Sequence, residues 1–281
     1  MQIQQARAHI MTVLAGGESP RADADVLLCH LLDCRRGYLM TWPERELDAA
    51  QQVTLQQWLD RRLAGEPIAH LVGEREFWSL PLKVSPATLI PRPDTEVLVE
   101  QALTKIPQGP CAVLDLGTGT GAIALALKSE RPEVDVWAVD RMADAAALAR
   151  ENSAALGLPI EVRHGSWFEP LGDAGLSKAP RFAVIVSNPP YIDGADPHLE
   201  QGDVRFEPRS ALVADEAGLA DIRHIVAHAP AYLLTDGWLL LEHGWDQGTA
   251  VRQLLGDNGY REVATVRDYG DNDRVTLGRC P

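Results

Sequence analysis

Residues 114–127 read LDLGTGTGAIALAL, and this stretch decides the fold. An apolar segment typical of a buried strand ends at Leu116, glycines follow at 117, 119 and 121, and a run of Ala, Ile and Leu continues as a helix. Glycines between a strand and a helix let the backbone turn tightly and approach a ligand, where a side chain would obstruct it. The stretch therefore predicts a strand, loop and helix that bind a nucleotide-like cofactor.

Strand-like and helix-like segments alternate around this loop. Helices are expected at 97–106, 122–130, 143–157 and 248–259, and strands at 111–117, 134–140, 160–165, 182–188 and 238–244. Such alternation predicts an α/β domain with a mostly parallel sheet, covered by helices on both faces. Two further strand-like runs, 260–271 and 274–279, predict a closing antiparallel hairpin at the C-terminal end.

The first part of the chain has a helical pattern instead. Ser19 before Pro20 is typical of a helix start. Apolar residues then recur at helical spacing in two stretches: Ala24, Leu27, Leu28, Leu31 and Leu32, and later Leu55, Trp58, Leu59 and Leu63. We expect a small helical bundle domain over residues 1–75. Residues 76–93 contain four prolines, which suit a short hairpin or a proline-rich linker, and the α/β domain is expected over 94–281.

Composition places the chain among ordinary globular proteins. It has 281 residues, more than one domain usually holds, with 46% hydrophobic and 23% charged residues. No apolar run approaches the ~20 residues of a membrane helix, and the N-terminus lacks the features of a secretory signal. The four cysteines are scattered without Cys-x-x-Cys spacing, which argues against both disulfides and a zinc site. We expect a cytoplasmic protein with no membrane contact and no metal.

The charge is distributed unevenly. The formal net charge is −14; residues 1–92 carry 10 Lys and Arg against 11 Asp and Glu, and the rest carries 16 against 29. A protein that neutralises phosphates along DNA or RNA usually presents a basic stripe. The acid-rich α/β domain therefore disfavours direct contact with nucleic acid.

Acidic residues flank the glycine loop. Asp140 ends the next strand, 23 residues beyond Gly117, about where an acid meets ribose hydroxyls in doubly wound folds. The glycines alone also fit a dinucleotide fingerprint, but Asp115 directly before them gives DxGxGxG. The alternative interpretation is that no ligand binds, that Asp115 only caps the turn, and that the glycines only allow tight packing of strand and helix. The candidate cofactor-binding residues are Gly117, Thr118, Gly119, Thr120, Gly121 and Asp140.

A second motif, SNPPY, ends the strand at 182–188, at the sheet edge where open α/β folds bind ligands. Pro189 and Pro190 donate no N–H group and hold the backbone rigid. The Asn188 side-chain oxygen and the Pro189 carbonyl can therefore accept both hydrogens of one incoming NH2 group, and Tyr191 offers a flat surface for stacking. These four residues are the candidate substrate pocket, with Asn188 and Tyr191 as candidate catalytic residues.

This arrangement suits a poor nitrogen nucleophile. The nitrogen of a carboxamide or an aromatic amine shares its lone pair with the adjacent π-system. Two acceptors outside that plane favour a pyramidal nitrogen and aim its lone pair at an electrophile such as a sulfonium methyl. Taken alone, the same residues could simply end a strand in a stiff turn.

The motifs resemble those of a known family. DxGxGxG resembles the first motif of S-adenosylmethionine-dependent methyltransferases, and Asn-Pro-Pro-Tyr the signature of amino-methyltransferases, which act on DNA adenine or on protein glutamine. Over nearly the whole chain, the sequence is similar to the HemK/PrmC family of peptide chain release factor N5-glutamine methyltransferases. The matching motifs are LIPRPDTE (89–96), DLGTGTGAIALAL (115–127), SNPPYI (187–192), GDVRFEPRSAL (202–212), LLLEHG (239–244) and RDYGDNDRVTLGR (267–279).

The resemblance implies a Rossmann-like methyltransferase domain and a helical domain that recognises the release factor. The implied reaction transfers a methyl group from S-adenosyl-L-methionine to the glutamine amide in the Gly-Gly-Gln motif of release factors, in translation termination. A monomer is expected. Carried over by residue, the cofactor site falls on 117–121, Asp140, Trp167 and Asn188, and the glutamine pocket on 188–191. Where such enzymes often place an acid for the adenine amino group, this chain has Ser166, so adenine recognition falls to that hydroxyl or to the backbone near Trp167.

Three other functions stay open. Adenine methylation of nucleic acid is disfavoured by the acidic α/β domain. A cofactor-sensing module without catalysis is disfavoured by the intact Asn-Pro-Pro-Tyr. A nicotinamide oxidoreductase would leave that motif unexplained.

Other polar pairs are weaker candidates. His224 and His228 have a spacing that could bind a metal, but without a third ligand two histidines on a polar helix face, or partly buried, are favoured. Glu242 and His243 follow a strand and are expected in a pocket wall, not as catalytic acid and base. Arg205 and Glu207 are candidates for shaping the substrate loop; the alternative is that they form a solvated ion pair.

Overall fold

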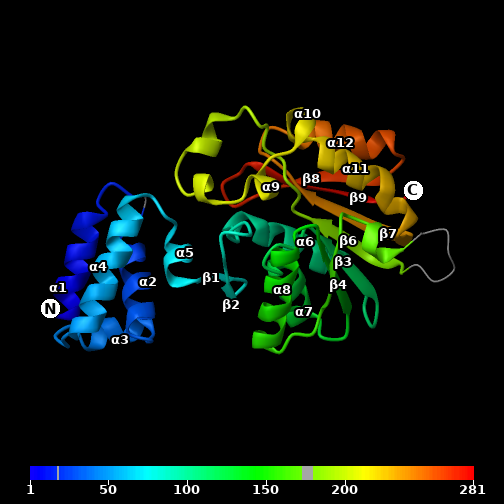
Figure 1. The fold of residues 1–281 in the computed structure, drawn as a ribbon. Coiled ribbons are helices and arrows are strands. Elements are labelled where there is room, and N and C mark those ends of the chain that lie inside the picture. The colour runs from blue at the N-terminus through cyan, green and yellow to red at the C-terminus, as the bar shows by residue number, and fades with distance from the viewer. Residues whose placement is uncertain (18, 173–179) are drawn as a thin grey trace. The chain divides into compact units, whose positions relative to one another are not determined.

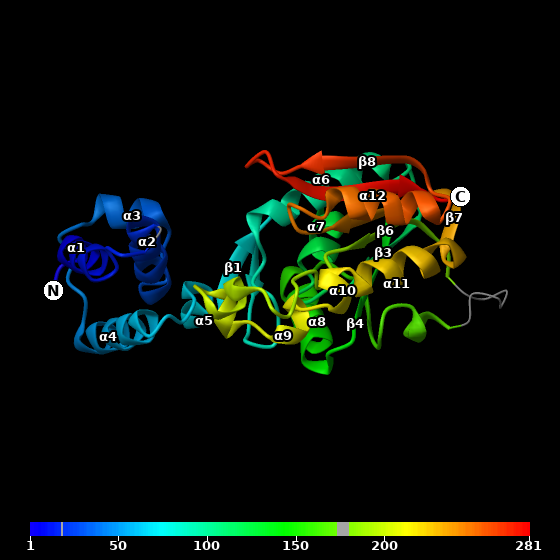
Figure 2. The ribbon, with the colours of Figure 1, turned by 90° about the horizontal axis from the view of Figure 1, so that it is seen from above.

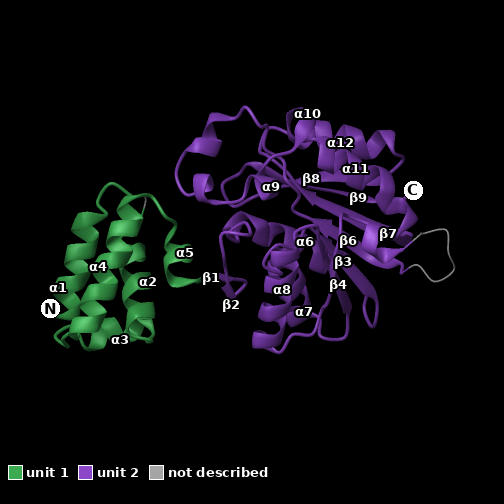
Figure 3. Cartoon of the chain, viewed as in Figure 1, with its two compact units in different colours: residues 1–74 green, residues 75–281 purple. Residues whose placement is uncertain are grey.

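Residues 1–74 and 75–281 form two separate units in the computed structural model, which describes residues 1–17, 19–172 and 180–281 (Figure 3). The segment 76–93 packs with the second unit. No helix in these described ranges is long and apolar enough to cross a membrane.

The first unit is a bundle of helices. They are α1 (Ile3–Val13), α2 (Pro20–Leu31), α3 (Arg36–Thr41), α4 (Ala49–Leu63) and α5 (Ile68–Val72). Helix α4 starts with a capping box, in which Asp48 accepts the N–H of Gln51 and the Gln51 side chain accepts the N–H of Asp48. Leucines at helical spacing fill the core, as the pattern predicts. Leu63 departs from the pattern, since it is 62% exposed at the end of α4.

The second unit contains a hairpin and a seven-stranded sheet. The hairpin consists of β1 (Glu74–Phe77) and β2 (Leu80–Lys83). The sheet strands are β3 (Ala112–Leu116), β4 (Asp135–Asp140), β5 (Glu161–His164), β6 (Phe182–Ser187), β7 (Leu233–Glu242), β8 (Arg261–Arg267) and β9 (Asp273–Arg279). Their order is β5-β4-β3-β6-β7-β9-β8, parallel from β5 to β7, with β9 antiparallel to both its neighbours. Figure 2 labels β3, β4, β6, β7 and β8 of this sheet. The predicted fold class, including the closing hairpin, is confirmed.

Helices connect the strands. They are α6 (Glu96–Lys105), α7 (Ala122–Glu130), α8 (Ala143–Leu156), α9 (Arg209–Leu212), α10 (Asp215–Gly218), α11 (Ala220–His228) and α12 (Gly248–Asp257). Short 3₁₀ turns are η1 (Pro93–Thr95), η2 (Glu169–Leu171), η3 (Pro197–Glu200), η4 (Val204–Phe206) and η5 (Ala229–Ala231).

Both faces of the sheet are covered (Figure 1). One hydrophobic core lies between the sheet and α6, α7 and α8, and a second lies between the sheet and α11 and α12. All six residues of β6 are buried, as expected for a central parallel strand packed on both faces. Each buried Val, Leu or Ile contributes about 1.5–3 kcal/mol relative to exposure, so burial of β6 stabilises the sheet whose edge carries the loops.

The strand register brings the key loops together. Leu116 of β3 lies opposite Ser187 of β6, and Ser187 lies opposite Leu241 of β7. The next residues of β3 and β6, Gly117 and Asn188, therefore leave the sheet at the same edge. Glu242, which follows Leu241 and ends β7, lies at this edge too.

Candidate active site

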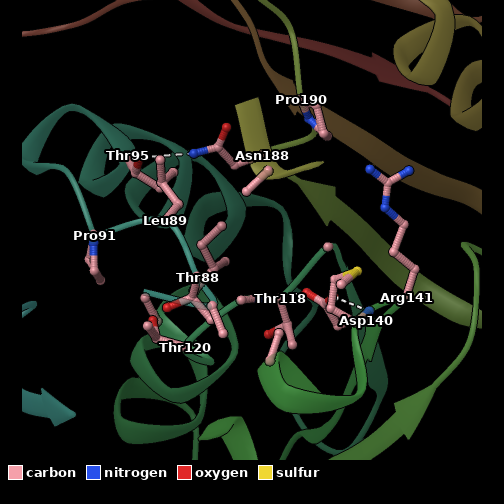
Figure 4. A pocket seen from close by; sticks show the side chains of 18 of the residues that line it. Thr88, Leu89, Pro91, Thr95, Thr118, Thr120, Asp140, Arg141, Asn188 and Pro190 are labelled. Atoms are coloured by element: carbon pink, nitrogen blue, oxygen red, sulfur yellow. Dashed lines mark hydrogen bonds between the residues drawn. The ribbon is translucent and has the colours of Figure 1, made fainter. Parts of the chain in front are cut away.

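A pocket opens at the carboxyl edge of the sheet, where β3 and β6 meet (Figure 4). The chain runs from β3 to β4 and β5 on one side and to β6 and β7 on the other, so this is the switch point at which open α/β folds bind ligands. The pocket is lined by residues 117–120, the ends of β4 and β6, and parts of the segments 87–95 and 210–211.

The glycine loop leaves room for a ligand. Gly117 has φ +73°, and a Cβ there would lie 3.7 Å from the Trp167 ring and 3.9 Å from the Asn188 carbonyl oxygen. Gly121 has φ +85°, and a Cβ there would lie 3.3 Å from the Ala149 Cβ. Of the predicted loop residues, Gly117, Thr118, Gly119 and Thr120 line the pocket, whereas Gly121 lets α7 pack closely against α8.

Asp140 lies beside the loop, as its position at the end of β4 predicts. Its Oδ2 accepts the N–H of Gly119 at 2.9 Å and its Oδ1 accepts the N–H of Met142 at 2.8 Å. Burial raises the pKa of this carboxyl, and the two N–H groups oppose that change. A buried acid fixed at the edge of the pocket is suited to accept hydrogen bonds from sugar hydroxyls.

Asp115 supports the loop from below. It is fully buried, its Oδ2 accepts the Thr118 hydroxyl at 2.6 Å, and its Oδ1 has no hydrogen-bond partner among the described residues. Burial raises its pKa to about 7. Asp115 therefore stabilises the turn, as the alternative interpretation suggested. Burial of its carboxyl group next to the glycine loop costs free energy.

Asn188 points its amide into the site. Its Nδ2 donates to the Thr95 hydroxyl at 3.2 Å, as Figure 4 shows, and no hydrogen bond to its Oδ1 is found in the described part of the chain. Asn188 and Pro190 line the pocket, and Pro189 lies between them in sequence. The acceptor oxygen that the sequence analysis required is thus free for an incoming NH2 group.

Tyr191 lies behind the pocket lining. It is half-buried, packs against the second core, and donates from its hydroxyl to Glu242 Oε1 at 3.4 Å. Burial and the charge of Glu242 raise the Tyr191 pKa. Its carbonyl oxygen accepts the Gln247 Nε2 at 3.0 Å, and a Cβ at Gly218 would lie 2.0 Å from that same oxygen. The turn after Asn-Pro-Pro is therefore held tightly from behind.

Trp167 lines the pocket beside Gly117, and Ser166 is not among the described residues that line it. The Trp167 ring lies 6.5 Å from the ring of His224, which stacks on His228 at 4.2 Å. Burial and His228 lower the pKa of His224. Both histidines are exposed on α11, which agrees with the polar-face interpretation, and their rings pack beside Trp167. No group of three or more potential metal ligands occurs in the described ranges.

The segment 87–95 is part of the pocket, which the sequence analysis missed. Its place is fixed by Glu207, whose Oε2 accepts the N–H of Ile90 at 3.1 Å and whose Oε1 pairs with Arg92. Glu207 is 5% exposed, so the solvated ion pair was a wrong interpretation. Its partner is Arg92, while Arg205 lies over the ring of Phe206. Glu207 thus joins the loop after η4 to the opposite pocket wall.

Asn152 of α8 is a second missed residue. It is 1% exposed, its Nδ2 donates to the carbonyls of Thr120 and Lys83, and its Oδ1 accepts the N–H of Lys83. One side chain thereby joins the glycine loop to the β1–β2 hairpin. An Asn within an Ala-rich helix was the only available signal.

Comparisons with known proteins agree with this geometry. A model of the PrmC N-terminal domain matches residues 5–73, and a model of the methyltransferase small domain matches residues 93–204. A methyltransferase structure from Pyrococcus furiosus aligns with a TM-score of 0.54 at 16% identity, covering 80% of this chain and 98% of that one. At that identity the likeness shows the fold alone.

Close relatives identify the family. A release factor glutamine methyltransferase from Vibrio cholerae is 59% identical over 266 residues, which are 94% of this chain and 91% of the relative. Another, from Escherichia coli K12, is 55% identical over 280 residues, which are 99% of both chains. The chain therefore belongs to the release factor glutamine methyltransferase (HemK/PrmC) family.

Proposed function

We propose that this protein transfers a methyl group from S-adenosyl-L-methionine to the side-chain amide nitrogen of the glutamine in the Gly-Gly-Gln motif of peptide chain release factors. The observation that carries the proposal is the free Oδ1 of Asn188 at the rim of a glycine-loop pocket. Family membership supports the glutamine over the adenine alternative, in agreement with the acidic α/β domain.

The pocket fits the cofactor. A Cβ at Gly117 would fill the space between Trp167 and Asn188, and Asp140 lies at the same rim. When bound, S-adenosyl-L-methionine supplies an electrophilic methyl group on a positively charged sulfur. Residues 117–120 and Asp140 would hold its amino acid and ribose parts, and Trp167 would cover the pocket near the adenine.

Asn188 and Pro189 orient the glutamine. Their two carbonyl oxygens accept both hydrogens of the substrate NH2 group, which turns the nitrogen lone pair out of conjugation and towards the methyl group. The same oxygens stabilise the positive charge that develops on this nitrogen. The nitrogen then releases one proton, which is acidic after alkylation, so no strong base is needed beforehand. Tyr191 stiffens this turn from behind.

We further propose that residues 1–75 hold the body of the release factor and that 94–281 carry catalysis together with the segment 76–93, which packs with them and supplies part of the pocket. Large apolar side chains on the first unit, among them Met40, Trp42 and Leu63, are more than half exposed. Exposed apolar side chains of this kind suit a protein interface. The four free cysteines suit the reducing cytoplasm, and we propose a monomer.

The test is incubation of the purified protein with a release factor and S-adenosyl-L-methionine. Mass spectrometry of the proteolysed release factor should show one added methyl group on the Gly-Gly-Gln peptide. A release factor with Gln replaced by Glu in that motif is the matched control. Methylation elsewhere, or none, would contradict the proposal.

A further inference from the structure

Glu242 is a buried acid that the reaction described above does not use. It ends β7 at the edge where Gly117 and Asn188 leave the sheet, and it is 2% exposed. Its Oε1 accepts the Tyr191 hydroxyl at 3.4 Å, and its Oε2 has no hydrogen-bond partner among the described residues. A buried carboxylate oxygen without a partner is costly, which calls for an explanation.

Thr95 lies between this acid and Asn188. It is 4% exposed, its Oγ1 accepts the Asn188 Nδ2 at 3.2 Å (Figure 4), and its side chain also interacts with the Glu242 carboxyl group. A hydroxyl has one proton to donate and can accept with its oxygen. Because Thr95 accepts from Asn188, its own proton is available for Glu242.

The direction of these bonds decides which end of the Asn188 amide faces the substrate. If Thr95 donates to an ionised Glu242, its lone pairs favour the Nδ2 of Asn188, so Oδ1 faces the pocket. If Glu242 is protonated, it can donate to Thr95, which is then free to donate to Oδ1 of Asn188. That arrangement turns the acceptor oxygen away from the glutamine.

We propose that Glu242 is a positioning residue, whose carboxylate acts through the Thr95 hydroxyl to hold Asn188 with Oδ1 towards the substrate amide. The inference rests on the proposed glutamine methylation and adds a residue to it. Glu242 does not touch the reacting atoms.

The groups around Glu242 set its pKa. Burial raises the Glu242 pKa to about 7, and Asp94 acts in the same direction, while Thr95, Arg274 and Tyr191 lower it. Arg274 is itself committed to Asp268, with Nε–Oδ2 at 3.0 Å. On the same edge, His243 bonds to Thr276 at 2.7 Å. Methyl transfer should therefore be fastest above about pH 7 and decline as pH falls through that value.

The first experiment is single-turnover methylation of a release factor between pH 6 and 8.5. Wild type should gain about tenfold in rate per pH unit on the acid side, and Glu242→Gln, which cannot ionise, should lose that dependence. Thr95→Val should lower the rate about tenfold or more, and Thr95→Ser should stay closer to wild type. Thr104→Val removes an exposed hydroxyl near the end of α6, whose bond is to the carbonyl of Gln101, and is the control.

Equal pH profiles for wild type and Glu242→Gln, or equal rates for the two Thr95 variants, would overturn the proposal. Calorimetry with S-adenosyl-L-methionine checks that each variant keeps a folded pocket.

A second measurement does not depend on activity. The side-chain NH2 signals of Asn188, followed by NMR, should shift with pH near 7 in wild type and not in Glu242→Gln. If these signals shift but no glutamine is methylated, the proposed function fails and the network stands. Asn188 signals that do not change with pH, or that shift equally in both proteins, would contradict the proposed hydrogen-bond network.

Discussion

The buried acid under the glycine loop makes stability depend on pH in a predictable way. The Asp115 pKa is raised from 3.8 to about 7, chiefly by burial, with the Thr118 hydroxyl acting against that change. Below pH 3.8 both the folded and the unfolded state hold this proton. Between 3.8 and about 7 only the folded state holds it, so unfolding releases a proton and the free energy of unfolding falls as pH rises. Above about pH 7 the loss is complete.

The size of the loss follows from the shift. One pKa unit corresponds to about 1.4 kcal/mol, so Asp115 alone contributes a decrease of at most about 4 kcal/mol between pH 4 and pH 8. Asp115→Asn keeps the shape and an acceptor for Thr118 but cannot ionise. Its free energy of unfolding should therefore decline less than that of wild type over this range.

The assay is urea unfolding at pH 5 and pH 8, followed by tryptophan fluorescence, since five of the seven tryptophans lie in residues 75–281. Glu242→Gln should also reduce the decline, because its raised pKa has the same sign. An Asp115→Asn protein that loses as much stability as wild type from pH 5 to pH 8 would refute the reasoning.

Further predictions concern the loop, the turn and the first unit. Gly119→Leu should abolish binding of S-adenosyl-L-methionine in calorimetry while the protein stays folded; unchanged affinity would show that the loop is not the cofactor site. Gly218→Ala should lower activity, since its Cβ would meet the Tyr191 carbonyl, whereas Gly256→Ala, with open space around it in α12, should keep it. Equal activities of the two glycine variants would show that the tight packing around Tyr191 does not matter for the reaction. Deleting residues 1–75 should impair methylation of an intact release factor far more than cofactor binding. Equal activity with and without these residues would show that they do not recognise the release factor.

The sequence predicts the fold well because its signals are local. Alternating strand and helix patterns fix a parallel sheet, and such a sheet places all strand ends at one edge. It was therefore possible to predict from the sequence that Gly117, Asp140 and Asn188 lie in one site, without knowing any contact between them. The family resemblance predicted Trp167 as a cofactor-site residue, and Trp167 lines the pocket.

Contacts between distant loops could not be predicted. Glu207 and Arg92 are far apart in sequence, and only the folded chain shows that the buried Glu207 pairs with Arg92. The position of Tyr191 behind the pocket depends on Gly218 and Gln247, and Gln247 lies 56 residues further along the chain. Such contacts depend on loop geometry, which hydrophobic periodicity does not encode.

The central claim is that Asn188 orients the glutamine amide. Single-turnover methyl transfer to a release factor, measured for wild type, Asn188→Ala and Asn188→Asp, tests it most directly. We expect the Ala variant to lose about 100-fold or more in rate with only modestly weaker binding, as when one preorganised electrostatic partner is removed. The Asp variant retains an acceptor oxygen and should keep partial activity. An Ala variant as fast as wild type would contradict the account.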